Sequence, residues 1–178
     1  MLESSKFNLS QVAARLGLAA MTLNIVRQIP EMIDIGFRYK NARIALEAYA
    51  GSAEEATDIT NAIIEASGNA VSNFEATANA TRLLSLGLAS NAEEAAKFTK
   101  TAITLGATMG KDVSGAFEEF SLLLANESIL RLDTFGISGA KVREEMARLA
   151  GEFPELDRNA RFVNATMTIA EEKMGKLE

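Results

Sequence analysis

The pattern Ser-x-x-Glu occurs at Ser52, Ser72 and Ser90, and each time it precedes apolar residues spaced as on one face of a helix. In such a capping box, hydroxyl and carboxylate satisfy backbone groups that the first helical turn leaves unpaired. After Ser90, one apolar stripe consists of Ala95, Phe98, Ala102, Leu105 and Met109. The sequence therefore predicts short helices that start at these serines and pack on one another.

The composition supports a helical fold over the whole chain. Most of the apolar residues are Ala and Leu, only two prolines occur, and 178 residues suffice for one domain, with or without an extension. We expect an all-α protein in which a kinked N-terminal amphipathic helix is followed by a compact array of short antiparallel helices. The expected division is an extended N-terminal helical segment, residues 1–50, and a helical-hairpin module, residues 51–178.

The N-terminal segment carries an apolar heptad seam, in which steps of four and three residues alternate. Pro30 lies in this seam and is expected to break or kink the helix. Further isoleucines and a methionine widen the apolar face beyond what one neighbouring helix covers, so we expect self-association or binding of another component through a coiled-coil-like contact. The candidate interaction residues are Val12, Leu16, Leu23, Val26, Ile33 and Phe37.

A membrane span is disfavoured in this segment. Its longest uncharged run, from Leu16 to Val26, has eleven residues, whereas a bilayer needs about twenty. A secretory signal is disfavoured too, because Arg27 and Glu31 follow the apolar run where a cleavage site should lie. We expect a helix that buries its seam against protein, with attachment to a membrane surface as the alternative.

The chain contains no histidine and no cysteine. Disulfide scaffolds, zinc-thiolate sites, cysteine nucleophiles, Ser-His-Asp catalysis and Glu-x-x-His metal sites are therefore excluded. We expect no enzyme activity, no cofactor and no metal. Residues 51–128 carry eleven acidic groups against four basic ones, which argues against specific nucleic-acid binding by neutralisation of phosphates.

Two local patterns are expected to be structural. The segment from Gly106 to Asp112 resembles a phosphate loop only superficially, because three residues instead of four separate its glycines and Asp follows the lysine. We interpret it as one helix end followed by the start of the next helix, at Asp112 or Ser114. Arg131 and Asp133 are expected to form a local turn network.

Further helix starts are predicted at Ser138 and Asp157. The helix that Asp157 opens carries a second heptad stripe that is still running where the chain stops. Its members are Val163, Met167, Ala170, Met174 and Leu177.

Several phrases of the sequence carry a resemblance to a known family. They are Asn-Ala-Thr-Arg-Leu-Leu-Ser-Leu-Gly-Leu-Ala followed by Ala-Glu-Glu-Ala, then Leu-Gly-Ala-Thr-Met-Gly-Lys-Asp-Val, Phe-Ser-Leu-Leu-Leu-Ala-Asn and Leu-Asp-Thr-Phe-Gly-Ile-Ser. In these phrases the chain resembles the tail tape-measure proteins of long-tailed phages and prophages, from about Arg43 onward. These segments are typical of helices and turns and contain no catalytic signature.

The resemblance implies a structural segment of a helical ruler, which sets tail length during assembly and is released at genome ejection. It implies the tail tube, the tail assembly chaperone and tail tip proteins as partners, and location in the virion tail lumen, or in the host cytoplasm during assembly. At about 1.5 Å per residue, 178 helical residues span roughly 270 Å, too little for a long tail. We therefore expect a fragment of a ruler. The alternative is a stand-alone cytosolic helical interaction or adaptor module.

Overall fold

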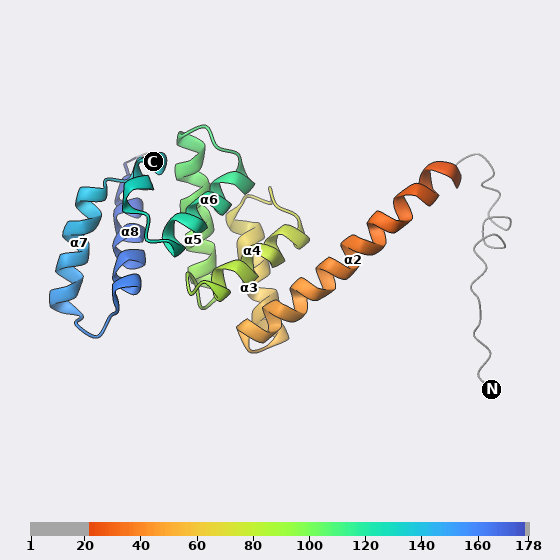
Figure 1. Cartoon of the computed structure of the whole chain (residues 1–178), viewed down its shortest axis with the longest axis horizontal. Coiled ribbons are helices and arrows are strands. Elements are labelled where there is room, and N and C mark those ends of the chain that lie inside the picture. Colours follow the sequence, from red (N-terminus) through yellow and green to blue (C-terminus); the bar gives the residue numbers. More distant parts are fainter. Residues whose placement is uncertain (1–21, 177–178) are drawn as a thin grey trace. The chain divides into compact units, whose positions relative to one another are not determined.

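The computed structural model describes residues 22–176, with side chains from residue 36 onward. Every element in this range is a helix, so the predicted all-α fold is confirmed (Figure 1). The elements are α2 (Thr22–Ala50), α3 (Ala53–Ala66), α4 (Asn73–Ser85), α5 (Ala92–Thr108), α6 (Val113–Ala125), the 3-10 helix η1 (Ile129–Phe135), α7 (Gly139–Glu152) and α8 (Arg158–Met174). The chain forms two units, with the boundary between Asn41 and Ala42.

The first unit is described only in its helical part, residues 22–41. Its backbone is helical through Pro30, so the break that the sequence had suggested at this residue does not occur. The neighbouring backbone hydrogen bonds suffice to continue the helix past the one that proline cannot donate. At this residue the structure describes the backbone and not the side chains. The predicted kink therefore stays a prediction.

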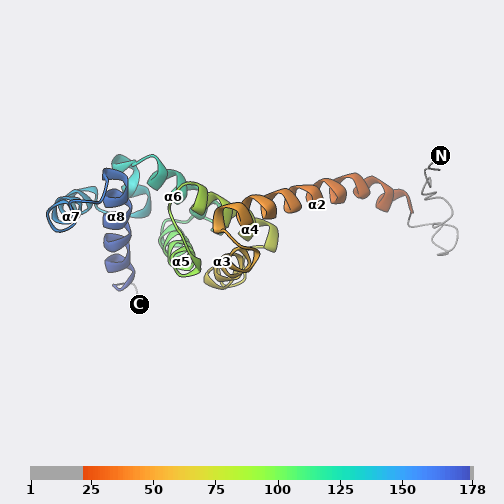
Figure 2. The ribbon, with the colours of Figure 1, turned by 90° about the horizontal axis from the view of Figure 1, so that it is seen from below.

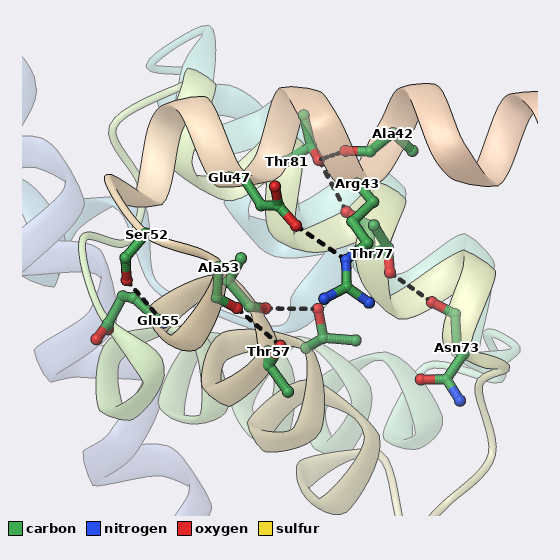
Figure 3. A network of polar contacts seen from close by, with 12 residues as sticks. Ala42, Arg43, Glu47, Ser52, Ala53, Glu55, Thr57, Asn73, Thr77 and Thr81 are labelled. Carbon is green, nitrogen blue, oxygen red and sulfur yellow. Dashed lines mark hydrogen bonds and ion pairs between the residues drawn. The ribbon is translucent and has the colours of Figure 1, made fainter.

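The second unit includes the last turns of α2 as well as residues 51–178. Leu46 is 1% exposed and belongs to its hydrophobic core. The Thr81 hydroxyl of α4 donates a hydrogen bond to the Ala42 carbonyl of α2 at 3.3 Å (Figure 3). Within α2, Arg43 pairs with Glu47 one turn later, at 2.9 Å. The compact unit therefore begins before the module predicted from the sequence.

The predicted N-caps of α3 and α4 are confirmed, and the complete capping box is formed at Ser72. The Ser52 hydroxyl accepts a hydrogen bond from the Glu55 amide at 3.1 Å. Ser72 and Glu75 form a complete box in which each side chain accepts from the other residue's backbone amide. These hydrogen bonds hold the pKa of the Glu75 carboxyl below its usual value, with the Ser72 amide as the main cause.

The predicted cap of α5 is wrong by one residue. The N-cap is Asn91, whose side-chain oxygen accepts from the Glu94 amide at 2.9 Å. Ser90 precedes the N-cap, and its amide and its hydroxyl both donate to the Glu94 carboxylate, at 2.7 and 2.8 Å. Glu93 takes no part in the box. A serine and an asparagine in succession both suit an N-cap, so the sequence pattern alone does not separate them.

Helices α5 and α6 and the 3-10 helix η1 form the aromatic centre of the second unit. The Phe98 ring of α5 lies 5.4 Å from Phe117 and 5.2 Å from Phe120 of α6, and Phe120 lies 5.0 Å from Phe135 of η1, between ring centroids. All four rings are almost fully buried. Four residues of the stripe predicted for α5 are buried, whereas Met109 is 47% exposed because it caps the C-terminus of the helix.

Helices α7 and α8 lie side by side (Figures 1 and 2). Ser138 and Asp157 cap them, as predicted. The stripe predicted for α8 needs correction. Ala170 and Met174 are buried, Val163 and Met167 are only half-buried, and Leu177 lies outside the described residues. Because α8 packs against both α5 and α7, its buried face is turned toward Phe162, Ala165 and Thr166.

Candidate interaction groove

The predicted N-terminal seam is only partly described. Val12 and Leu16 lie outside the described residues. Leu23, Val26 and Ile33 lie in α2 where its backbone alone is described. The side chain of Phe37 is described and is 63% exposed. The seam therefore stays a prediction, and of its members only Phe37 is placed, as an open apolar side chain.

The second unit contains an open groove of about 730 Å³, which we call the α8 groove. One wall is a single stripe of α8, in which Ala160, Val163, Asn164 and Met167 follow one another at helical spacing. This explains why the first two members of the predicted α8 stripe, Val163 and Met167, are only half-buried. They line the groove and also pack against the edge of the hydrophobic core.

The opposite wall is the connection from α4 to α5. Leu86 ends α4, and Gly87 takes a left-handed φ of +66°, which reverses the chain. The Leu88 amide then donates to the Leu83 carbonyl at 2.8 Å and so closes the helix end. Leu84 and Leu86 are left along the groove, and Tyr49 of α2 also lines it. Tyr49 is 57% exposed and Leu86 is 40% exposed, so the groove has an open apolar wall.

The charged groups around the groove are already paired. Glu94 accepts from Ser90, and Asp157 accepts from the Ala160 amide at 2.7 Å as the cap of α8. The Lys97 ammonium lies 2.7 Å from the Glu171 carboxylate and joins α5 to α8. The groove lining therefore mixes exposed apolar side chains with polar groups, and the charged groups among them already have partners.

The second polar cluster of the unit is structural. Lys111, the lysine of the apparent phosphate loop, binds Glu119 of α6 at 2.6 Å and lies 5.2 Å above the Phe135 ring. Arg131 binds the other oxygen of Glu119 at 3.3 Å, in place of the expected network with Asp133. These cations hold the pKa of Glu119 below its usual value of 4.5, with the Lys111 hydrogen bond as the largest cause. The cluster ties the start of α6 to η1.

The interpretation of the glycine-rich segment as a helix end is confirmed. α5 ends at Thr108, and Gly110 turns the chain with a left-handed φ of +74°. Asp112, the first of the two predicted candidates, caps α6 by accepting from the Gly115 amide at 2.8 Å.

The sequence-based reasoning missed the groove. Tyr49 and Leu86 stand at helix ends, where apolar residues do not stand out against a helical pattern. The available signal was Leu-Gly-Leu at residues 86–88, which places two large apolar side chains on either side of a turn glycine. An apolar residue in such a turn indicates either a core contact, as at Leu88, or an open surface, as at Leu86.

Comparisons of the chain with protein-family models, curated proteins and solved structures give no match. Within the described residues, no group of three or more acidic side chains could together hold a metal ion. In the same part of the chain, no helix is long and apolar enough to cross a membrane. Function is therefore inferred from the residues and their arrangement.

Proposed function

We propose that this chain is a structural segment of a phage tail tape-measure protein, in which helical regions set tail length and the second unit docks to another tail component. The observation that carries the proposal is the resemblance of the phrases quoted above, which lie between Asn79 and Ser138 in a similarity that extends from about Arg43 to the C-terminus. They form helix ends and turns of the second unit, including the α4–α5 connection and η1. An all-helical chain suits a mechanical role that needs no catalytic side chain.

A second candidate is a helical interaction or adaptor module without a role in tails. The α8 groove is the observation that favours it, because the exposed apolar side chains of Tyr49 and Leu86 line it, and exposed apolar surface is typical of protein–protein contacts. The two candidates differ in where the gene lies. Genes for a tail tube, a tail chaperone and a portal beside it favour the tape-measure proposal.

Tail length gives the direct test. Deleting residues 22–41 in frame from the phage or prophage gene removes about 30 Å of helix, at about 1.5 Å per residue. Electron microscopy of the particles should then show tails shortened by that amount, and duplication of the same residues should lengthen the tails equally. Replacing the segment by an unrelated helix of equal length is the control and should leave tail length unchanged. Unchanged tails after both the deletion and the duplication would contradict the ruler.

A further inference from the structure

Helix α7 takes only a small part in the hydrophobic core of the second unit. Of its fourteen residues, Val142 and Leu149 are buried, whereas α5 buries seven of its seventeen residues. Met146 is half-buried and packs against the edge of the core. α7 packs mainly against α8 and to a lesser extent against η1. Few apolar contacts therefore hold α7 in place, which is typical of an element that opens before the rest of a domain unfolds.

The polar side chains of α7 bind within the helix itself. Arg148 donates to the Glu145 carboxylate at 2.8 and 2.6 Å, and its other nitrogen lies 2.5 Å from the Glu152 carboxylate. Among the described residues, no hydrogen bond or ion pair joins a side chain of α7 to another element. Ion pairs three and four residues apart stabilise a helix without regard to its neighbours. They are kept when α7 moves, so they do not oppose its separation from α8.

α8, in contrast, is tied to the rest of the unit by charged side chains. Lys97 of α5 lies 2.7 Å from the Glu171 carboxylate of α8. At the end of the same helix, the Lys173 ammonium donates to the Phe135 and Gly136 carbonyls at 3.1 and 2.9 Å and so holds α8 to η1. Separation of α8 from the unit would break these bonds, whereas separation of α7 from α8 breaks mainly apolar contacts. The weaker boundary is therefore the one between α7 and α8.

The connections at the two ends of α7 allow such a movement. Residues 151–155 are exposed, and the Phe153 amide donates to the Leu149 carbonyl of α7 itself, at 2.8 Å. Before α7, the Ile137 amide donates to the Leu132 carbonyl at 2.9 Å and fixes the chain to η1. A rotation of α7 therefore needs a backbone change only between Ile137 and the start of the helix, and in the exposed connection to α8.

We propose that α7 is a cover that opens as one body while the rest of the second unit stays folded. Opening exposes the apolar side chains of Val142, Met146 and Leu149 together with the side of α8 that α7 covers. The chain thus has a closed state and an open state that differ in exposed apolar surface. The inference goes beyond the proposed function, because it concerns the movement of one helix and requires no tail component.

Single introduced thiols report this opening, because the full chain contains no cysteine. Val142→Cys places a thiol at a position of 0% exposure on α7, and Leu105→Cys does the same on α5. Ala147→Cys, at an exposed position of α7, gives the rate of a freely accessible thiol. With the disulfide reagent DTNB in native buffer, Val142→Cys should react roughly 100-fold or more faster than Leu105→Cys, yet more slowly than Ala147→Cys. Low urea should accelerate Leu105→Cys more steeply, because global unfolding exposes more surface.

A substitution far from α7 separates local opening from global unfolding. Ile59→Val removes one methyl group from the core side of α3, whose packing partners are α4 and α5. It should accelerate the reaction of Leu105→Cys by about 2- to 10-fold, the usual effect of this change on stability. The reaction of Val142→Cys should stay unchanged, because opening of α7 leaves α3 in place.

Three outcomes would overturn the proposal. Equal rates for Val142→Cys and Leu105→Cys mean that α7 opens only when the whole unit unfolds. An equal acceleration of both thiols by Ile59→Val means the same. A Val142→Cys variant that reacts as fast as Ala147→Cys means that α7 is not packed in the native chain. Leu149→Cys on the same face of α7 repeats each measurement if Val142→Cys does not fold.

Discussion

Gly106 marks the closest approach of two helices in the second unit. A Cβ atom at this position would lie 2.3 Å from the Ala116 Cβ of α6. Both residues are buried, and the atom that would be struck sits directly on the α6 backbone, so α5 and α6 must separate to admit a methyl group. The glycine is required here by packing between helices, not by backbone conformation.

We predict that Gly106→Ala lowers the free energy of unfolding by about 1 to 3 kcal/mol, the usual range for overpacking. This outweighs the gain of up to about 1 kcal/mol that alanine brings to a helix interior. Gly151→Ala in α7 is the matched control, because a Cβ there meets nothing within 4 Å, and it should be neutral or stabilising. Urea unfolding followed by circular dichroism measures both. Equal effects would mean that α5 and α6 lie farther apart.

The start of α5 gives a second prediction for single residues. Asn91→Ala should lower the free energy of unfolding by about 1 kcal/mol, the usual cost of losing an N-cap side chain. Ser90→Ala should cost less, because the Ser90 amide still donates to the Glu94 carboxylate. The same unfolding experiment ranks the two variants. If Ser90→Ala proves the more costly, the helix begins one residue earlier, as the sequence pattern had suggested.

Among the secondary-structure elements, η1 depends on one carboxylate for its attachment to α6. Glu119 binds Lys111 before α6 and Arg131 within η1, and its own side chain is 28% exposed. The partial burial makes the pair stronger than an ion pair in open solvent, while Lys111 also covers the Phe135 ring. A short 3-10 helix has few hydrogen bonds of its own, so such a tie matters for its position.

The ion pairs of Glu119 with Lys111 and Arg131 predict that the stability of the folded chain depends on pH. The pKa of Glu119 is lowered in the folded chain, so the unfolded chain binds a proton first as the pH falls. The stability from the tie is complete above the usual value of 4.5 and is lost as the pH drops through the lowered pKa. Glu119→Gln should remove this part of the acid dependence in unfolding curves between neutral pH and about pH 3. Lys111→Met, which removes the main cause, should do the same. Curves parallel to the unmutated chain would contradict the tie.

At the scale of the whole molecule, the second unit begins at Ala42, within α2. Leu46 of α2 is buried in the core, and Thr81 of α4 binds the Ala42 carbonyl. A chain that starts at residue 51 therefore lacks a core side chain.

We predict that residues 51–178 alone are less stable than residues 42–178, by about the 2 to 5 kcal/mol that loss of a buried leucine costs. Chemical unfolding of the two fragments measures the difference. Leu46→Ala in the full chain is the comparison that isolates the side chain. If the two fragments unfold at the same urea concentration, the end of α2 is dispensable and the module begins at residue 51.

The sequence determined the helical class and most helix boundaries. Local chemistry explains this success, because a cap such as Ser72, Asp112 or Asp157 acts on amides two or three residues away. The aromatic centre was partly foreseeable too, because Phe98 and Phe117 lie on regular apolar stripes. At Asn91 the local pattern misled, because two adjacent residues could serve as cap.

Which residues of different helices meet, and which stay open, was decided by the tertiary structure alone. The sequence places Val163 and Met167 on an apolar stripe of α8, but the positions of α5 and α7 decide which stripe is buried and which lines a groove. Leu46 enters the core, although helical periodicity equally allows an exposed end of α2. Glu119 meets Arg131 across twelve residues of chain. Periodicity records which residues share a face, whereas the neighbour of that face depends on contacts between residues far apart in the chain.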